Sequence, residues 1–202
     1  MKFILFCEGH TEHKALPAFL KRWLDSRLAQ PVGIKSVRFD GWRELVDDSP
    51  KKAGIYLAKP DVIAVIALLD LYGPTIYPLH LTTAKDRYNW AKNSLERKVD
   101  NSRFKQFFAV HETEAWLLGD KNVFPRQIKS ILNRYSRLPE SVNFTKPPAK
   151  LLNDVYLQAT QRRYKKVTHG KELFMKADVN LAYNSCPSLK QMLDEMLFLA
   201  AS

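Results

Sequence analysis

Hydrophobic and polar residues alternate along the first 120 positions in a pattern that predicts strands and helices in turn. Strands are expected over residues 2–7, 32–39, 62–69 and 104–110, and helices over 14–29 and 84–99, with a further helix beginning at 111–118. Residues 42–58 are expected to be helical but interrupted at Ser49-Pro50. Residues 62–69 are all apolar, which is typical of a strand buried on both faces. This order predicts an α/β fold, a mostly parallel sheet with helices on both faces.

The rest of the chain has the apolar spacing of helices, over residues 125–135, 148–164, 170–176 and 187–200. We therefore predict an α/β domain over residues 1–120, and a helical part over residues 121–202 that packs on it. The hydrophobic fraction of 46% supplies enough apolar surface for a core, which excludes global disorder.

Charge changes this picture, because almost all of the net +11 lies in one stretch. Residues 121–176 hold 13 Lys and Arg against 3 Asp and Glu, a net charge of +10. Segregated positive charge favours contact with nucleic acid, either DNA or RNA, and Tyr135, Tyr156 and Tyr164 within the stretch are candidates to stack on bases. The alternative is a solvated helical face whose tyrosines pack inward. Candidate contacts to nucleic acid or phosphate are Arg162, Arg163, Lys165 and Lys166.

The sequence argues against several other kinds of site and location. Cys7 and Cys186 are far apart and form no metal-binding pair, which fits a reducing cytosol. No secretory segment or membrane span is expected, so we predict a cytoplasmic protein without a membrane partner. No P-loop is present, and any ATP dependence is therefore expected to come from a partner. His10, His13 and His111 are a weaker alternative, a zinc site.

Acidic residues follow three of the predicted strands. Glu8 follows the first, Asp70 the third and Glu112 the fourth, with Glu114 two residues later. Sites form beyond the carboxyl ends of parallel strands, and carboxylates that converge there repel one another unless a cation lies between them. Oxygen ligands favour Mg²⁺ or Mn²⁺, which suits phosphodiester hydrolysis. The alternative is that each acid only caps a helix or pairs with its dipole.

Two further residues are candidate partners of a phosphate or carboxylate. His111 ends the fourth strand and is placed to orient such a group. Lys171 follows Gly170, which is expected to open a helix whose first N–H groups face a phosphate. The alternative for Lys171 is an ordinary loop lysine.

Glu8-Gly9 after the first strand, with Thr11-Glu12 opening a helix, resembles the start of TOPRIM domains, the metal-binding α/β domains of topoisomerases, primases and overcoming-lysogenization-defect (OLD) nucleases. More specifically, four stretches across nearly the whole chain resemble the domain-of-unknown-function family 4276. They are Glu8-Gly9-His10-Thr11-Glu12, Leu69-Asp70-Leu71-Tyr72-Gly73, His111-Glu112-Thr113-Glu114-Ala115-Trp116-Leu117-Leu118, and a tail from Tyr164-Lys165-Lys166 through His169-Gly170-Lys171 to Cys186-Pro187.

The resemblance implies a TOPRIM-like sheet with a divalent-metal site, and pairing with an ATPase of the ABC/AAA type, often in bacterial antiviral defence. One position departs from the TOPRIM pattern, because Tyr72 stands where the second Asp of Asp-x-Asp is expected. Glu112 or Glu114 is the candidate replacement.

Two functions follow from these residues. The first is a Mg²⁺- or Mn²⁺-dependent nuclease, in which Glu8 is a ligand and possible general base, Asp70 is a ligand, and Glu112 and Glu114 complete the site. The second is a non-catalytic TOPRIM-like module that binds an ATPase partner or nucleic acid.

Overall fold

The computed structural model describes residues 1–135, 138–141 and 146–201. Its centre is a four-stranded sheet made of β1 (Lys2–Cys7), β2 (Gly33–Arg38), β3 (Val62–Asp70) and β4 (Phe104–Ala109). The strand order is β2-β1-β3-β4 and every neighbouring pair is parallel. The predicted α/β fold with a parallel sheet is therefore confirmed, and β3 lies between two neighbours, as its continuous apolar run requires.

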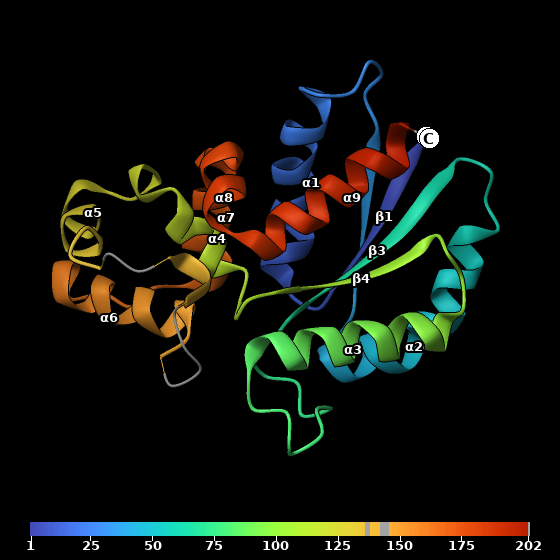
Figure 1. Cartoon of the computed structure of the whole chain (residues 1–202). Coiled ribbons are helices and arrows are strands. Elements are labelled where there is room, and N and C mark those ends of the chain that lie inside the picture. The colour runs from blue at the N-terminus through green and yellow to red at the C-terminus, as the bar shows by residue number, and fades with distance from the viewer. Residues whose placement is uncertain (136–137, 142–145, 202) are drawn as a thin grey trace.

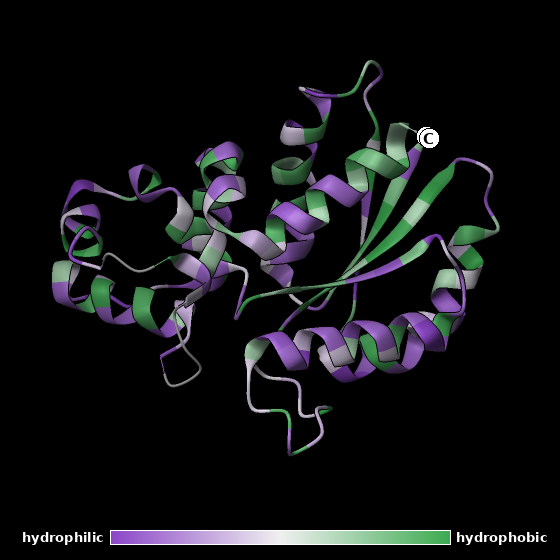
Figure 2. Ribbon diagram, in the orientation of Figure 1, coloured by the Kyte–Doolittle hydropathy of each residue, from purple (hydrophilic) through white to green (hydrophobic). Residues whose placement is uncertain are grey.

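The pleat of the strands divides the hydrophobic core into two layers. Phe3 and Leu5 of β1 point into one layer, whereas Ile4 and Phe6 point into the other. The first layer is covered by α1 (His10–Asp25) and α9 (Pro187–Ala201), and the second by α2 (Trp42–Leu57) and α3 (Ala84–Val99). Figure 1 shows these helix pairs on opposite faces of the sheet. Figure 2 shows β3 as mostly hydrophobic, whereas α3 carries many polar residues.

The remaining helices gather to one side of the sheet (Figure 1). They are α4 (Glu114–Gly119), the 3-10 turn η1 (Lys121–Val123), α5 (Arg126–Leu132), the 3-10 turn η2 (Pro139–Ser141), α6 (Pro148–Thr160), the π-helical turn η3 (Lys166–Gly170), α7 (Lys171–Lys176) and α8 (Val179–Ser185). Their apolar residues belong to the same hydrophobic cluster as those of α1. A division at residue 120 stays a prediction. None of the helices in the described part of the chain is both long and apolar enough to cross a lipid bilayer.

The predicted helices differ from the observed ones at several points. Helix α1 begins at His10 and ends at Asp25, α6 ends at Thr160, and α8 was not predicted. Helix α6 stops because Gln161 adopts the left-handed conformation, with φ of 57°. Helix α2 continues through Pro50, where an interruption is expected from the sequence. The apolar face of α2 is buried against the sheet, and this packing outweighs the missing backbone hydrogen bond.

Candidate metal and phosphate site

The acidic residues expected at the strand ends do share one edge of the sheet. Strands β1, β3 and β4 are adjacent and parallel, and they end at Cys7, Asp70 and Ala109. Glu8 therefore begins the connection from β1 to α1, Glu112 lies in the connection from β4 to α4, and Glu114 is the first residue of α4. The topology brings all of these segments to the carboxyl edge of the sheet, where sites form in α/β proteins.

Three carboxylates converge there on a single ammonium group. The Lys166 Nζ lies 3.1 Å from Glu12 Oε1, 3.3 Å from Asp70 Oδ2 and 3.3 Å from Glu114 Oε2. Glu12 is in the first turn of α1, Asp70 ends β3 and Glu114 begins α4. We call Glu12, Asp70 and Glu114 the acidic cluster. Its residues are 4%, 7% and 0% exposed, so their negative charges are held largely out of water.

Thr113 ties the acidic cluster together. Its backbone N–H donates to Asp70 Oδ1 at 2.9 Å. Its hydroxyl lies 3.1 Å from Glu12 Oε1 and 3.5 Å from Glu114 Oε2. Thr113 is itself buried, so it fixes the carboxylates of three separate elements relative to one another. This arrangement holds the acids close despite their mutual repulsion.

Burial and crowding make the site electrostatically unusual. Burial raises the pKa of Asp70 well above its usual value; the Lys166 charge opposes this, and the charges of Glu12 and Glu114 add to it. Burial also raises the pKa of Glu114. The pKa of Glu8 is raised to about 7, first by burial and then by the charge of Glu12. One ammonium is shared among several acids, so no single carboxylate is fully compensated.

For the pKa of Lys166, the neighbouring negative charges outweigh the effect of burial. Burial alone would lower the pKa of its ammonium, but the charges of Asp70, Glu114 and Glu12 outweigh burial and raise that pKa well above its usual value. The residue opens η3, and its backbone carbonyl accepts a hydrogen bond from the Thr11 hydroxyl at 3.0 Å. The start of α1 thus anchors the segment that carries Lys166.

Gly9 gives the Glu12 carboxylate its place. A Cβ atom at residue 9 would lie 1.9 Å from Glu12 Oε2, so the carboxylate occupies the space that any other side chain would need. The Glu-Gly pair of the sequence is explained by this close approach rather than by an unusual backbone conformation, because the Gly9 φ is −112°.

The donor chemistry of the acidic cluster suits a hard divalent cation, but a lysine holds the position. Glu12 Oε2 and Glu114 Oε1 are buried and have no hydrogen-bond partner among the described residues. Such carboxylate oxygens are the ligands that Mg²⁺ and Mn²⁺ take. As the side chains stand, however, the described residues contain no group of three or more His, Cys, Asp or Glu arranged to hold a metal ion. The Lys166 ammonium lies among the oxygens instead.

Two other predicted site residues lie near the same edge but are not in the acidic cluster. Glu112 Oε2 accepts a hydrogen bond of 2.8 Å from the backbone N–H of Ala149, near the start of α6. It is therefore directed to a helix N-terminus, and its role as a metal ligand stays a prediction. His111 is buried, and burial lowers its pKa, with the Arg87 charge adding to the effect.

The predicted basic residues divide between the surface and the acidic cluster. Arg162, Arg163 and Lys165, here called the basic segment, are exposed and directly precede Lys166 in the chain. Lys171 is exposed at the start of α7. Lys166, expected on the basic surface, turns inward to the acids. Residues 136, 137 and 142–145 of the basic stretch lie outside the described residues.

Sequence reasoning missed Glu12, Thr113 and the inward position of Lys166. A signal existed for Glu12, because it follows Glu8 by four residues and lies in the first turn of a helix that begins at the sheet edge. No local signal marks Lys166, which is 96 residues from Asp70 in sequence.

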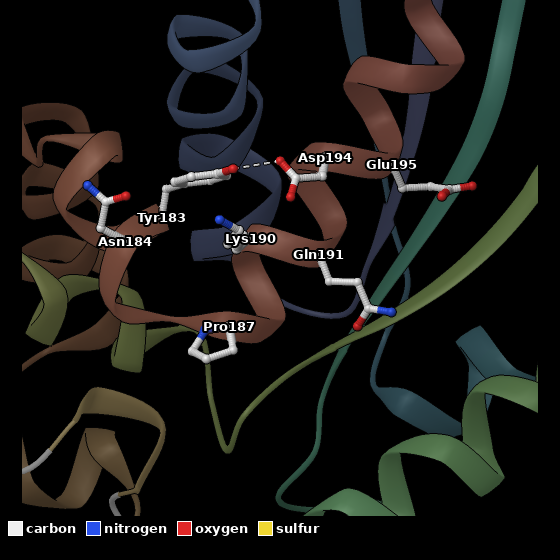
Figure 3. Close-up of a pocket in the computed structure, with 7 residues that line it drawn as sticks. All are labelled: Tyr183, Asn184, Pro187, Lys190, Gln191, Asp194 and Glu195. Carbon is white, nitrogen blue, oxygen red and sulfur yellow. Dashed lines mark hydrogen bonds between the residues drawn. The ribbon is translucent and has the colours of Figure 1, made fainter.

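Two hollows are relevant to the site. One of about 330 Å³ opens over the acids and is lined by Glu8, Gly9, His10, Thr11, Glu12, Gly41, Lys166 and Val167. The other, of about 490 Å³, lies on α8 and α9, and none of the acidic cluster lines it. Figure 3 shows its side chains, with the Tyr183 hydroxyl donating to Asp194 at 2.7 Å. The first hollow gives a ligand access to the carboxylates of Glu8 and Glu12, whereas Asp70 and Glu114 do not line it.

Comparison with known proteins gives a family match and similar folds. A family model described as a domain of unknown function (DUF4276) matches residues 7–197. The structure is similar to the C-terminal region of the Burkholderia pseudomallei OLD protein, with a TM-score of 0.48, 16% identity and coverage of 98% of both chains. It is also similar to the C-terminal region of the Xanthomonas campestris pv. campestris OLD protein, with a TM-score of 0.45, 14% identity, and coverage of 99% of this chain and 94% of that one. The comparison with curated proteins found no match.

Proposed function

The chain belongs to the DUF4276 family, and we propose that it is a nuclease-like phosphodiesterase that depends on Mg²⁺ or Mn²⁺ and acts on nucleic acid. The observation that carries the proposal is the acidic cluster, because three buried carboxylates on separate elements are held together and, among the described residues, Lys166 alone forms ion pairs with them. Uncompensated buried carboxylates are costly, and such groups are typical of functional sites.

The residues present can be given roles from their positions. Glu12, Asp70 and Glu114, with Glu8 beside them, would hold the divalent cation, which when bound polarises a phosphate and lowers the pKa of water. In the metal-free site burial raises the pKa of the Glu8 carboxyl to about 7. Its place beside the acidic cluster makes Glu8 the candidate general base, because a bound cation favours the ionised carboxylate that accepts a proton. The ammonium of Lys166 supplies a positive charge at the same place, suited to a phosphate oxygen.

The basic segment supports nucleic acid as the substrate. Its three side chains are exposed, and they precede Lys166 by one to four residues. A phosphodiester backbone that lies along this segment is thereby brought to the edge of the hollow over the acids. Positive charge next to a hydrolytic site attracts the polyanion and orients it, because phosphate contacts supply most of the sequence-independent affinity.

An ATPase partner of the ABC/AAA type, and a role in bacterial defence, are part of the same proposal. They rest on the family resemblance of the motifs around Glu8, Asp70 and Glu114, not on a feature of the surface. The test is whether a candidate ATPase, encoded next to this chain, changes cleavage of nucleic acid when ATP is added.

One observation favours a second candidate, a non-catalytic module. Lys166 already compensates the acidic cluster in part, and Tyr72 occupies the position of the second Asp of the TOPRIM pattern. In that case the cluster is a structural link between η3 and the sheet edge, and the basic segment alone binds nucleic acid or a partner.

Cleavage assays separate the two candidates. Labelled single- and double-stranded DNA and RNA are incubated with purified protein in Mg²⁺, Mn²⁺ or EDTA, beside Asp70→Asn and, as a control, the exposed Glu172→Gln. We expect cleavage that EDTA abolishes, that Asp70→Asn lowers by about 100-fold or more, and that Glu172→Gln leaves unchanged. Cleavage that Asp70→Asn retains in full contradicts the proposed site. Absence of cleavage with every metal and substrate favours the non-catalytic module.

A further inference from the structure

We propose that Lys166 is a displaceable counter-ion, whose ammonium compensates the acidic cluster until a divalent cation replaces it and the side chain moves out toward the basic segment. This inference rests on the proposed metal site. It adds that metal loading and the position of Lys166 are coupled, so that the ammonium becomes available to a phosphate when the cation is in place.

The Lys166 ammonium lies between the three carboxylates of the acidic cluster. Its nitrogen lies at nearly equal distances, 3.1–3.3 Å, from one oxygen of each member of the acidic cluster. These contacts are longer than the roughly 2.7–2.9 Å of a direct ammonium–carboxylate hydrogen bond. The ammonium is therefore shared among the three carboxylates, at the point where a cation bound by all of them would lie.

One ammonium leaves the negative charge of the acidic cluster incompletely compensated. Three buried carboxylates face a single positive charge, and Glu12 Oε2 and Glu114 Oε1 have no partner within the described part of the chain. Glu8, which lines the same hollow as Glu12 and Lys166, adds a fourth acid. A divalent cation neutralises more of this charge and offers coordination to the unpartnered oxygens, and its direct approach to the same oxygens excludes an ammonium from their centre.

The Lys166 side chain can move from the acidic cluster to solvent. The Lys166 side chain is 35% exposed although its ammonium lies among buried acids, and the residue lines the hollow of about 330 Å³ beside Glu8. Its backbone is held by the Thr11 hydroxyl, so rotation of the side chain alone carries the ammonium toward solvent. The next residue along the chain, Lys165, is already exposed on the basic segment.

The first experiment compares metal binding by Lys166→Met with that of the wild type and of the matched control Lys165→Met. Methionine keeps most of the apolar stem and removes the charge. We expect Lys166→Met to lower the melting temperature in EDTA, to bind Mn²⁺ at least about ten-fold more tightly by calorimetry, and to gain more thermal stability from Mn²⁺ than the wild type. Lys165→Met is expected to match the wild type in all three measurements.

The second experiment uses only the wild-type protein, so it tests the displacement of Lys166 even if Lys166→Met fails to fold. An amine-reactive acetylating reagent is applied with and without saturating Mn²⁺, and the modified lysines are located by tandem mass spectrometry. We expect Lys166 to be protected by its three ion pairs without metal and several-fold more reactive with Mn²⁺. Lys165 serves as the internal reference, with equal reactivity in both conditions.

The outcomes distinguish this inference from the proposed function. If the wild type binds Mn²⁺ but Lys166→Met binds it equally or more weakly, or Lys166 stays protected in Mn²⁺, the counter-ion role is wrong while the metal site stands. If neither protein binds Mn²⁺, both the inference and the metal-dependent function are wrong. Tighter binding by Lys166→Met supports the displacement even where the wild type shows no cleavage.

Discussion

Replacement of Glu8 by glutamine removes a carboxyl group that is costly to ionise in the folded protein. The folded-state pKa of Glu8 is about 7, against an ordinary value of 4.5, mainly because the group is buried and secondly because Glu12 is close. Between these two pH values the unfolded chain loses the proton while the folded chain keeps it. Stability therefore falls as the pH rises from about 4.5 to about 7, and the loss is complete above the folded pKa.

The size of the effect follows from the same two values. Their difference, from 4.5 to about 7, corresponds to at most about 3.5 kcal/mol, since each tenfold change in proton affinity is worth about 1.4 kcal/mol. Glutamine is neutral at every pH and nearly the same shape as a protonated glutamate. Glu8→Gln is therefore expected to match the wild type near pH 4 and to be more stable by about 1–3 kcal/mol at pH 8.

Urea unfolding in EDTA, followed by the fluorescence of the buried Trp23 and Trp116, measures this difference at pH 4, 5.5, 7 and 8. The control is Glu172→Gln, because Glu172 is exposed on α7 and its replacement is expected to have an effect that does not grow with pH. A stability difference that is the same at pH 4 and pH 8 refutes the argument from burial. A less stable Glu8→Gln at pH 8 means instead that Glu8 is a structural residue at the start of α1.

Three further predictions follow. Replacement of the three basic-segment residues by glutamate is expected to weaken nucleic-acid binding and to reduce the steepness with which log affinity falls against log salt concentration, by about 2–3 in slope. An unchanged slope in a salt titration means that the segment does not contact phosphate. Gly9→Ala is expected to displace the Glu12 carboxylate and so to weaken Mn²⁺ binding measured by calorimetry. The control is Gly54→Ala inside α2, where a Cβ atom meets nothing within 4 Å; it is expected to leave Mn²⁺ binding unchanged and to raise the free energy of unfolding by about 0.5–1 kcal/mol. Glu140→Ala is expected to lower the free energy of unfolding, measured in urea, by about 1–3 kcal/mol, because the Glu140 carboxylate accepts hydrogen bonds from the backbone N–H and hydroxyl of Ser188 at the start of α9. A loss below about 0.5 kcal/mol would mean that this helix cap contributes little to stability.

The sheet and the edge that carries the acids were predictable because they depend on local patterns. The apolar run of β3 and the alternation of strands with helices each have a single explanation in a parallel sheet, and parallel strands bring their carboxyl ends together. The positions of Glu8 and Asp70 at that edge follow from the same rule. Pro50 misled the prediction for α2, because tertiary packing of the apolar helix face decides the conformation there.

The centre of the candidate site was not predictable, because it depends on contacts between distant segments. The contact between Lys166 and Asp70 depends on the packing of the segment that carries Lys166 against the sheet edge. The neighbours of Lys166 in sequence suggest a surface lysine. Glu112 illustrates the converse, since it lies in the connection after β4, as Glu8 does after β1, and yet turns to Ala149 in α6. Strand-end position selects candidate acids, but packing decides which of them converge.

A crystal structure with Mn²⁺, using its anomalous scattering to locate the metal, tests the central claim most directly. The account predicts an anomalous peak among the carboxylate oxygens of Glu12, Asp70 and Glu114, at about 2.0–2.3 Å from its ligands, with the Lys166 ammonium moved away from them. Crystals in saturating Mn²⁺ that show no peak at the acidic cluster, with Lys166 still in contact with all three carboxylates, would contradict both the metal site and the function proposed for it.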